Sequence, residues 1–295
     1  MLEYDSVESL AREAEGRGKK ISEIVLDDQA EAMRLPGERL FEDMRRNLGV
    51  MRNAASSGAD QTLKSRSGLS GGNGYRMTRY AAGGGGAGPV SGAFCAAAMA
   101  KAVAIAEYNA AMGRIVAAPT AGSCGILPAA ILSMEDFYKV SEHNLVMSLF
   151  TAGGIGLVIV KNASIAGAEG GCQAECGSAA ALAAAALVEL RDGSPGQAAE
   201  ACAIALKNQL GLVCDPVAGL VEVPCVKRNA GGVMCAIAAA DMALAGVKSV
   251  IPVDEVISAM REIGEAMPSS LRETAQGGLA VTPTGQALKQ KIFGD

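Results

Sequence analysis

The chain has 295 residues and no tryptophan, and only 3% of its residues are aromatic although 50% are hydrophobic. Its core must therefore be built from Ala, Val, Leu, Ile and Met. Alanine and leucine are strong helix formers, whereas sheets draw on aromatic and β-branched residues. The composition predicts a mainly α fold. Because no internal repeat and no linker between folding units is visible, we expect one large helical domain over residues 1–295.

Long basic runs are also absent, and the formal net charge is -5. We therefore expect no nucleic-acid partner, since a polyanion would need a basic patch. The start, MLEYDSVESLAREAEG, lacks the basic and apolar regions of a signal peptide. The longest apolar run, residues 145–160, is shorter than the roughly 20 residues that span a bilayer. These features predict a cytoplasmic protein without a membrane span, in which 145–160 is a buried helix.

Zinc-type cysteine spacing is missing as well, although the chain has eight cysteines. A structural zinc site favours paired C-x2-C spacings, whereas this chain has CQAEC and, farther on, CDPVAGLVEVPC. The cytosol keeps thiols reduced, so a disulfide framework is not expected. Cys95, Cys202 and Cys235 lie in alanine-rich segments and are predicted to be core thiols. The other five lie in loops, where thiolates from distant segments can hold an iron-sulfur cluster: Cys124, Cys172, Cys176, Cys214 and Cys225.

Charged residues are concentrated in residues 1–57, which read as amphipathic helices, whereas residues 58–295 read as an apolar helical core. Residues 56–77 and 81–92 are rich in Gly and Ser and are predicted to be loops. Helices that are apolar nearly all round must be covered by this chain or by a partner, so we also expect an oligomer. We place these helices at 93–112, 127–134, 145–160, 178–191, 197–209, 232–245 and 254–266.

Glycine-rich junctions next to these helices are the places where we expect chemistry: residues 65–74, 118–128, 161–177 and 212–232. Glycine permits positive φ and close backbone approach, so such loops can point amide groups at an anion. The same glycines can serve only to let helices turn and pack. The run GGGG at 83–86 fits no nucleotide-binding fingerprint.

The motifs SGLSGGNG, APTAGSCGILPA, NASIAGAEGGCQAE and LGLVCDPVAGLVEVPCVKRNA occur along the chain. Together they resemble the α subunit of the bacterial iron-sulfur-dependent L-serine dehydratase, also called L-serine deaminase. The resemblance extends along the whole chain. It implies that L-serine is converted to pyruvate and ammonia, and that the glycine-rich loops converge on a cluster site.

The resemblance implies a 4Fe-4S cluster held by Cys172, Cys214 and Cys225. Cys124 and Cys176 occupy positions that are not expected to be ligands. Single-chain relatives carry a C-terminal cysteine that can cover the fourth iron, and this chain has no cysteine after Cys235. Three ligands agree with the chemistry, because an iron with an open position can act as a Lewis acid on the substrate hydroxyl.

The general base is harder to place. The single histidine, His143, lies in a polar stretch and is predicted to be a surface residue. In the resemblance an S-H-T motif belongs to a separate β subunit or an N-terminal domain, and this sequence contains no such motif, so we expect a partner chain to complete the active site. Lys64 and Lys161, which flank glycine loops, are the local candidates for the base. Candidate donors to the substrate carboxylate are the loop amides and four hydroxyls: Ser67, Ser70, Thr120 and Ser123.

Two other classes remain open. An electron-transfer iron-sulfur protein would need a fourth cysteine ligand and no access for a substrate. A non-enzymatic helical assembly subunit would use all its cysteines as core thiols and bind no iron. A pyridoxal phosphate lyase would catalyse the same reaction, but no lysine lies in a convincing Schiff-base setting.

Overall fold

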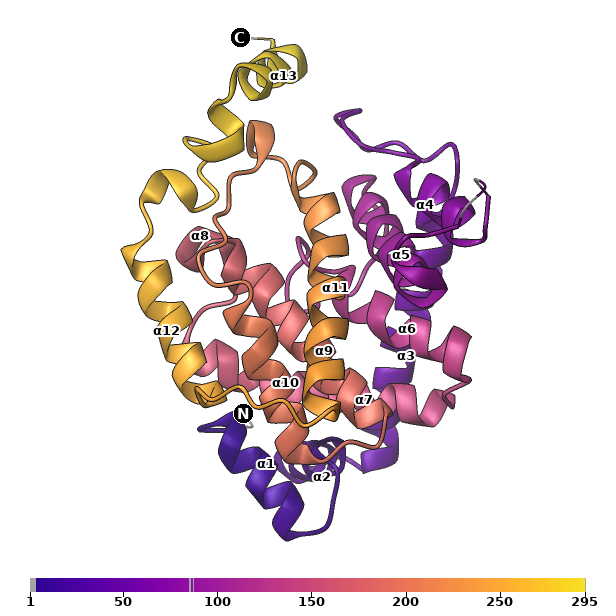
Figure 1. Ribbon diagram of the computed structural model, residues 1–295, viewed down its shortest axis with the longest axis vertical. Coiled ribbons are helices and arrows are strands. Elements are labelled where there is room, and N and C mark those ends of the chain that lie inside the picture. Colours follow the sequence, from indigo (N-terminus) through magenta and orange to yellow (C-terminus); the bar gives the residue numbers. More distant parts are fainter. Residues whose placement is uncertain (1–3, 85, 87, 295) are drawn as a thin grey trace.

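A computed structural model describes residues 4–84, 86 and 88–294, and every regular element in these ranges is helical (Figure 1). The α-helices are α1 (Val7–Gly16), α2 (Ile21–Met33), α3 (Gly37–Gly58), α4 (Asn73–Ala81), α5 (Gly92–Ala110), α6 (Ile126–Tyr138), α7 (Glu142–Asn162), α8 (Gly167–Gly170), α9 (Ser178–Leu190), α10 (Pro195–Lys207), α11 (Cys225–Leu244), α12 (Val253–Ala266) and α13 (Pro283–Phe293). Shorter elements are the π-helical η1 (Gln173–Gly177) and the 3-10 turns η2 (Val217–Gly219), η3 (Ser269–Leu271) and η4 (Gly278–Val281). The predicted mainly α fold is confirmed.

Helix α9 is the centre of the molecule (Figure 1). Its sequence SAAALAAAALVEL is buried along almost its whole length, and it packs against α6, α7, α10 and α11. Alanine side chains are short, so neighbouring helices can approach α9 closely. The alanine-rich, aromatic-poor composition thus serves a dense helical core, as predicted.

Helix α7 contains the long apolar run and is long and apolar enough to cross a membrane by length and composition. However, 67% of its most apolar window is buried inside the fold. It packs against α2 on one side and α9 on another. It therefore has the character of a core helix, as the sequence predicts for 145–160.

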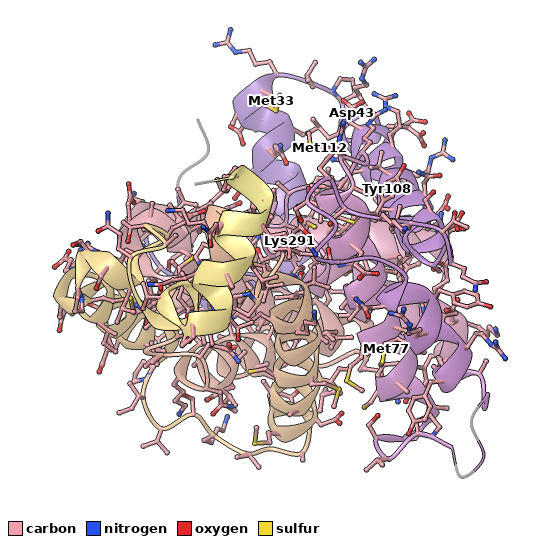
Figure 2. The ribbon with its side chains drawn as sticks, turned by 90° about the horizontal axis from the view of Figure 1, so that it is seen from above. Met33, Asp43, Met77, Tyr108, Met112 and Lys291 are labelled. Atoms are coloured by element: carbon pink, nitrogen blue, oxygen red, sulfur yellow. The ribbon has the colours of Figure 1, made fainter. Side chains whose placement is uncertain are left out.

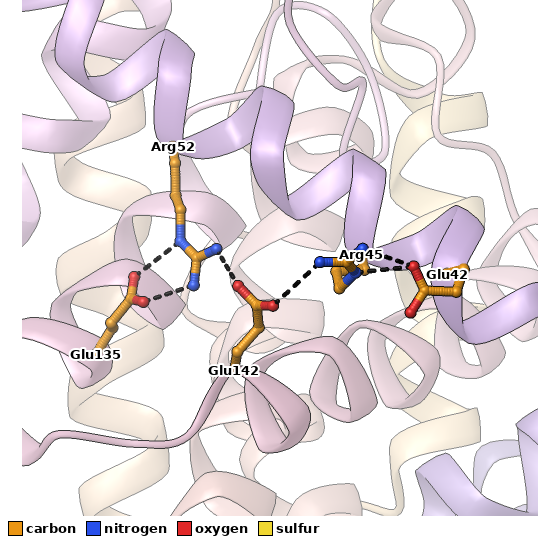
Figure 3. A network of polar contacts seen from close by, with 5 residues as sticks. All are labelled: Glu42, Arg45, Arg52, Glu135 and Glu142. Carbon is orange, nitrogen blue, oxygen red and sulfur yellow. Dashed lines mark hydrogen bonds and ion pairs between the residues drawn. The ribbon is translucent and has the colours of Figure 1, made fainter. Parts of the chain in front are cut away.

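The N-terminal helices α1 to α3 are amphipathic, as predicted for residues 1–57. The buried side chains of α1 and α2 include Val7, Leu10, Ile21 and Ile24, and they join the same apolar core as α9. Polar contacts fix the outer face of α3. Arg52 of α3 forms ion pairs with Glu135 of α6 and Glu142 of α7, and Arg45 links Glu142 to Glu42 (Figure 3).

The structure differs from prediction at several helix ends. Helix α3 continues to Gly58 and α4 begins at Asn73, so the loop predicted at 56–77 is shorter. Helix α11 begins at Cys225 although Gly231 and Gly232 favoured a loop there. The physical reason is packing: a Cβ on Gly232 would lie 2.4 Å from Ile126 Cδ1, so the glycine makes room for α6. Helix α13 was not predicted.

The C-terminal segment runs from α12 through η3 and η4 to α13. Helix α13 packs on η2 and η4 and stands apart from the body of the molecule (Figure 1). Seen from that end, α13 with Lys291 lies toward the viewer (Figure 2). Before α13, the chain crosses over residues 213–219, one of the predicted loop junctions.

The glycine-rich loop at 65–74 is shaped by Glu107, a carboxylate of α5 that is 1% exposed. Its oxygens accept hydrogen bonds from the amide groups of Gly71, Asn73 and Gly74 and from the Asn73 side chain. These amides are the unpaired donors at the start of α4, and a carboxylate also matches the positive end of the helix dipole. Glu107 therefore fixes the end of this loop to α5.

Replacing Glu107 by alanine should destabilise the protein. The change leaves buried amide donors without partners, and such groups cost about 1 to 3 kcal/mol each before relaxation, so we expect a loss of about 3 kcal/mol. The measurement is the free energy of unfolding in urea. Glu262→Ala, which removes an exposed carboxylate on α12, is the control and should change this energy by less than about 0.5 kcal/mol. Equal effects of the two changes would contradict the role of Glu107.

Candidate functional site

Cys172 lies between α8 and η1, 2% exposed. Its neighbour Gln173, which is fully buried, ties this turn to the chain that leads to Cys214. The backbone N–H of Gln173 donates to the Leu212 carbonyl at 2.9 Å, and the Gln173 side-chain oxygen accepts from the Gly211 backbone amide at 2.9 Å. The residues before Cys214 are therefore held beside Cys172.

Cys214 is 3% exposed and is fixed by the C-terminal segment. Its backbone amide donates to the Leu271 carbonyl and its carbonyl accepts from the Glu273 amide, both at 2.8 Å. These two bonds pair Cys214 with Arg272 in a single parallel β-bridge. Asp215 accepts from the Leu279 amide at 2.8 Å. The segment 269–282 thus holds the Cys214 backbone in place.

Cys225 is the first residue of α11 and is 8% exposed. One turn later, the buried Asn229 side chain donates to the carbonyls of Cys225 and Gly122 and accepts from the Gly125 amide. Asn229 therefore joins the predicted junction at 118–128 to the start of α11. Three of the predicted glycine-rich junctions meet at this end of the helices.

The three thiols share one electrostatic environment. Burial is the main cause that raises the pKa of Cys225 to about 12, and the neighbouring Cys172 is the second. The same two causes raise the pKa of Cys214. Arg228 lies among them on α11, where it donates to the Val213 carbonyl at 2.7 Å and pairs with Asp215 at 2.8 Å. The structure therefore brings Cys172, Cys214 and Cys225 to one site beside a cation.

Cys176 lies next to this site, with its Sγ 3.3 Å from the Sγ of Cys172. The hydrogen bond between these two thiols lowers the pKa of Cys172, and the nearby Arg228 acts in the same direction. Cys124, by contrast, is buried in a separate apolar cluster with Ala54 and Ile105. Cys202 is fully buried in the main core, as predicted for a core thiol, and Cys95 and Cys235 pack against that core.

The chemistry of the donor set suits an iron-sulfur cluster, whose usual ligands are thiolates from separate segments. Among the described residues, no group of three His, Cys, Asp or Glu side chains is close enough to hold one metal ion. A cluster binds each thiolate through a different iron, so its ligands need not converge on a point. Three buried thiols from separate segments, with Arg228 to balance negative charge, match that requirement.

Two carboxylates that the sequence analysis missed lie at the site. Glu175, between Cys172 and Cys176, fills space that two glycines leave open: a Cβ on Gly167 or Gly122 would lie 2.8 or 3.2 Å from its oxygens. Burial raises the pKa of Glu175. The second is Glu222, 5% exposed and three residues before Cys225. Their proximity in sequence to the cysteines was the signal that could have found them.

Three of the four predicted hydroxyls donate to these carboxylates. Ser67 and Ser70 donate to Glu222 at 2.8 and 2.9 Å. Thr120 donates to Glu175 at 2.9 Å and lies 3.0 Å from the Ser123 hydroxyl. The loop amides proposed for an anion are bonded within the chain: those of 71, 73 and 74 to Glu107, and those of 69 and 70 to serine hydroxyls.

The candidate bases do not gather at the cysteines. Lys64 is exposed, and Lys161 forms an ion pair with Asp5 at 2.8 Å. His143 is exposed at the start of α7 and stacks on Phe41, as expected for a surface residue. None of four cavities of about 460 to 590 Å³ lined by described residues has one of the three cysteines in its lining, although the one of about 460 Å³ is lined by Gly170 and Ala174 of the loop that carries Cys172.

Comparison with known proteins identifies one family of relatives. Residues 16–280 match the family model described as serine dehydratase alpha chain. The chain is 52% identical to the probable L-serine dehydratase, alpha chain, of Bacillus subtilis, over 93% of this chain and 90% of that one. It is 46% identical to the L-serine dehydratase, alpha chain, of Peptoniphilus asaccharolyticus, over 94% of each. It is 47% identical to L-serine dehydratase 1 of Escherichia coli, over 61% of this chain but only 40% of that protein.

Proposed function

The chain belongs to the serine dehydratase alpha chain family, and from this we propose that it is the cluster-bearing subunit of an L-serine dehydratase. The reaction converts L-serine to pyruvate and ammonia. The observation that carries the proposal is the meeting of Cys172, Cys214 and Cys225 beside Arg228. Free thiols throughout the described chain suit a reducing compartment, and we propose the cytoplasm as its location.

The cofactor that we propose is a 4Fe-4S cluster held by these three cysteines. When bound, it would supply a Lewis acid that polarises the substrate hydroxyl, which is otherwise a poor leaving group. Arg228 would balance the negative charge of the thiolates. The alanine-rich α9, which follows directly after η1, would shield this side of the site from bulk water.

The remaining groups of this chain bind and orient rather than abstract the Cα proton. Glu175 and Glu222, with their hydroxyl partners, lie where they can accept hydrogen bonds from a substrate. Of the candidate bases, Lys64 and His143 are exposed and Lys161 is paired with Asp5, so we propose that a partner β subunit supplies the base.

The test is an anaerobic purification, followed by iron and sulfide analysis, an absorbance spectrum, and an assay for pyruvate from L-serine with a partner chain present. We expect iron and sulfide in the protein and pyruvate formation. Failure to bind iron under these conditions would favour a non-enzymatic assembly subunit. A cluster whose spectrum L-serine does not change, without pyruvate formation, would favour an electron-transfer protein.

A further inference from the structure

Glu222 is a buried carboxylate without a cationic partner. The residue is 5% exposed, and among the described residues neither a lysine nor an arginine forms an ion pair with it. Its partners are the hydroxyls of Ser67 and Ser70, at 2.8 and 2.9 Å. A buried charge is costly unless it is paired, so this carboxylate is suited to bind a cation.

The position of Glu222 connects it to the cysteine site. Its carbonyl accepts a hydrogen bond from the Val226 amide at 3.0 Å, in the first turn of α11, which begins at Cys225. The adjacent Val221 lies 3.4 Å from where a Cβ on Gly122 would be, and a Glu175 oxygen lies 3.2 Å from that same point. The segment that carries Glu222 therefore faces the same loop as Glu175.

The hydrogen-bonding capacity at Glu222 suits a cation with several N–H donors. Each carboxylate oxygen accepts one serine hydroxyl and keeps a further lone pair. The Ser70 hydroxyl also keeps lone pairs after it donates its proton, whereas the Ser67 hydroxyl already accepts from the Leu69 amide at 3.0 Å and keeps at most one. The unused capacity around Glu222, Ser67 and Ser70 therefore consists of acceptors. A substrate carboxylate would meet acceptors only, whereas an ammonium group would find a partner for each proton.

We propose that Glu222, supported by Ser67 and Ser70, binds the α-ammonium group of L-serine and so selects α-amino acids over hydroxy acids. The inference rests on the proposed function, because it names a recognition element of the same site. It changes the predicted role of the two serines: they position an acid for the ammonium group instead of donating to the substrate carboxylate. The hydroxyl and carboxylate of L-serine are then left to face the cysteine side.

The test compares L-serine with 3-hydroxypropionate, which has the same hydroxyl and carboxylate but no ammonium group. Sites that use buried polar groups to recognise a substrate reject an analogue that lacks the matching group by large factors, so the wild type should bind L-serine at least about 100-fold more tightly. Glu222→Gln, in the cluster-loaded complex with the partner chain, should raise the KM for L-serine about 100-fold. The Ki of 3-hydroxypropionate should stay within about threefold, because that ligand does not use the carboxylate.

Glu189→Gln is the matched control. Glu189 is also a buried carboxylate, 6% exposed, but it accepts from Thr151 and Ser22 in another part of the core. It should leave both constants unchanged. Ser67→Ala is a second, milder variant and should raise only the KM for L-serine. Iron content is measured for every variant, so that loss of the cluster is separated from loss of binding.

The outcomes distinguish the two proposals. A wild-type complex that forms no pyruvate contradicts the proposed function itself. An active wild type in which Glu222→Gln leaves the KM unchanged overturns the inference about Glu222. A variant with wild-type iron content that weakens L-serine and 3-hydroxypropionate equally overturns it too, because a purely structural role predicts that result.

Discussion

Replacing Cys214 by alanine should give a folded chain that retains almost no iron after anaerobic reconstitution with iron and sulfide. Loss of an outer partner of a metal ligand already lowers metal affinity about 10- to 100-fold, so loss of a ligand should lower it by more than about 100-fold. The backbone at Cys214 should remain in place, because Leu271 and Glu273 hold it through main-chain hydrogen bonds. L-serine turnover should fall with the iron content.

The measurement is iron and sulfide per chain, with circular dichroism to confirm that the helices remain. Cys202→Ala is the matched control, since Cys202 is fully buried in α10 and lies in the apolar core. Both substitutions remove a buried thiol, but only Cys214→Ala should lose the cluster. Full iron content in Cys214→Ala would refute the assignment of the three ligands.

Cys176 provides a sharper version of this test because its sulfur lies 3.3 Å from that of Cys172. We expect Cys176→Ala to keep most of its iron, and Cys172→Ala to lose it. The reverse result would move the ligand role from Cys172 to Cys176. A loss of iron in both variants would mean that the cluster has four thiol ligands, and the electron-transfer alternative would then be favoured.

The parts of the fold that the sequence predicts best are the helices with the simplest composition. The helix expected at 178–191 is α9, Ser178–Leu190, because uninterrupted alanine and leucine leave no competing structure. Residues 232–245 were also recognised as helical, but the glycines of α11 obscured its first two turns. A glycine that breaks a helix and a glycine that admits Ile126 look the same in one sequence.

The arrangement of the site was less predictable. The sequence motifs indicated the three cysteines and the hydroxyls, but not that Ser67 and Ser70 meet Glu222, more than 150 residues away. Such contacts depend on how whole helices pack, which local patterns do not encode. The C-terminal segment that bonds to Cys214 was missed for the same reason, since its residues carry no periodic signal.

The cluster-loaded chain in isolation should turn over L-serine at least about 1,000-fold more slowly than the same chain with a β subunit, because general acid-base catalysis contributes about 10²- to 10⁴-fold. The structure gives the physical reason. Lys64 is exposed, Lys161 is paired with Asp5, and His143 lies at the surface against Phe41. The region aligned with the Escherichia coli relative covers 61% of this chain and 40% of that protein.

The experiment mixes the loaded chain with a purified β subunit that carries the histidine motif, confirms the complex by gel filtration, and measures initial rates of pyruvate formation. The control is a β subunit in which that histidine is replaced, and it should bind the chain without restoring the rate. If the β subunit acted only by covering the site, this variant would restore the rate as well. Turnover by the isolated chain at a rate near that of the complex would show that the base lies within this chain. Lys64→Met and Lys161→Met would then be compared, because a lysine that serves as the base should lose turnover on replacement while the chain keeps its iron and its affinity for L-serine.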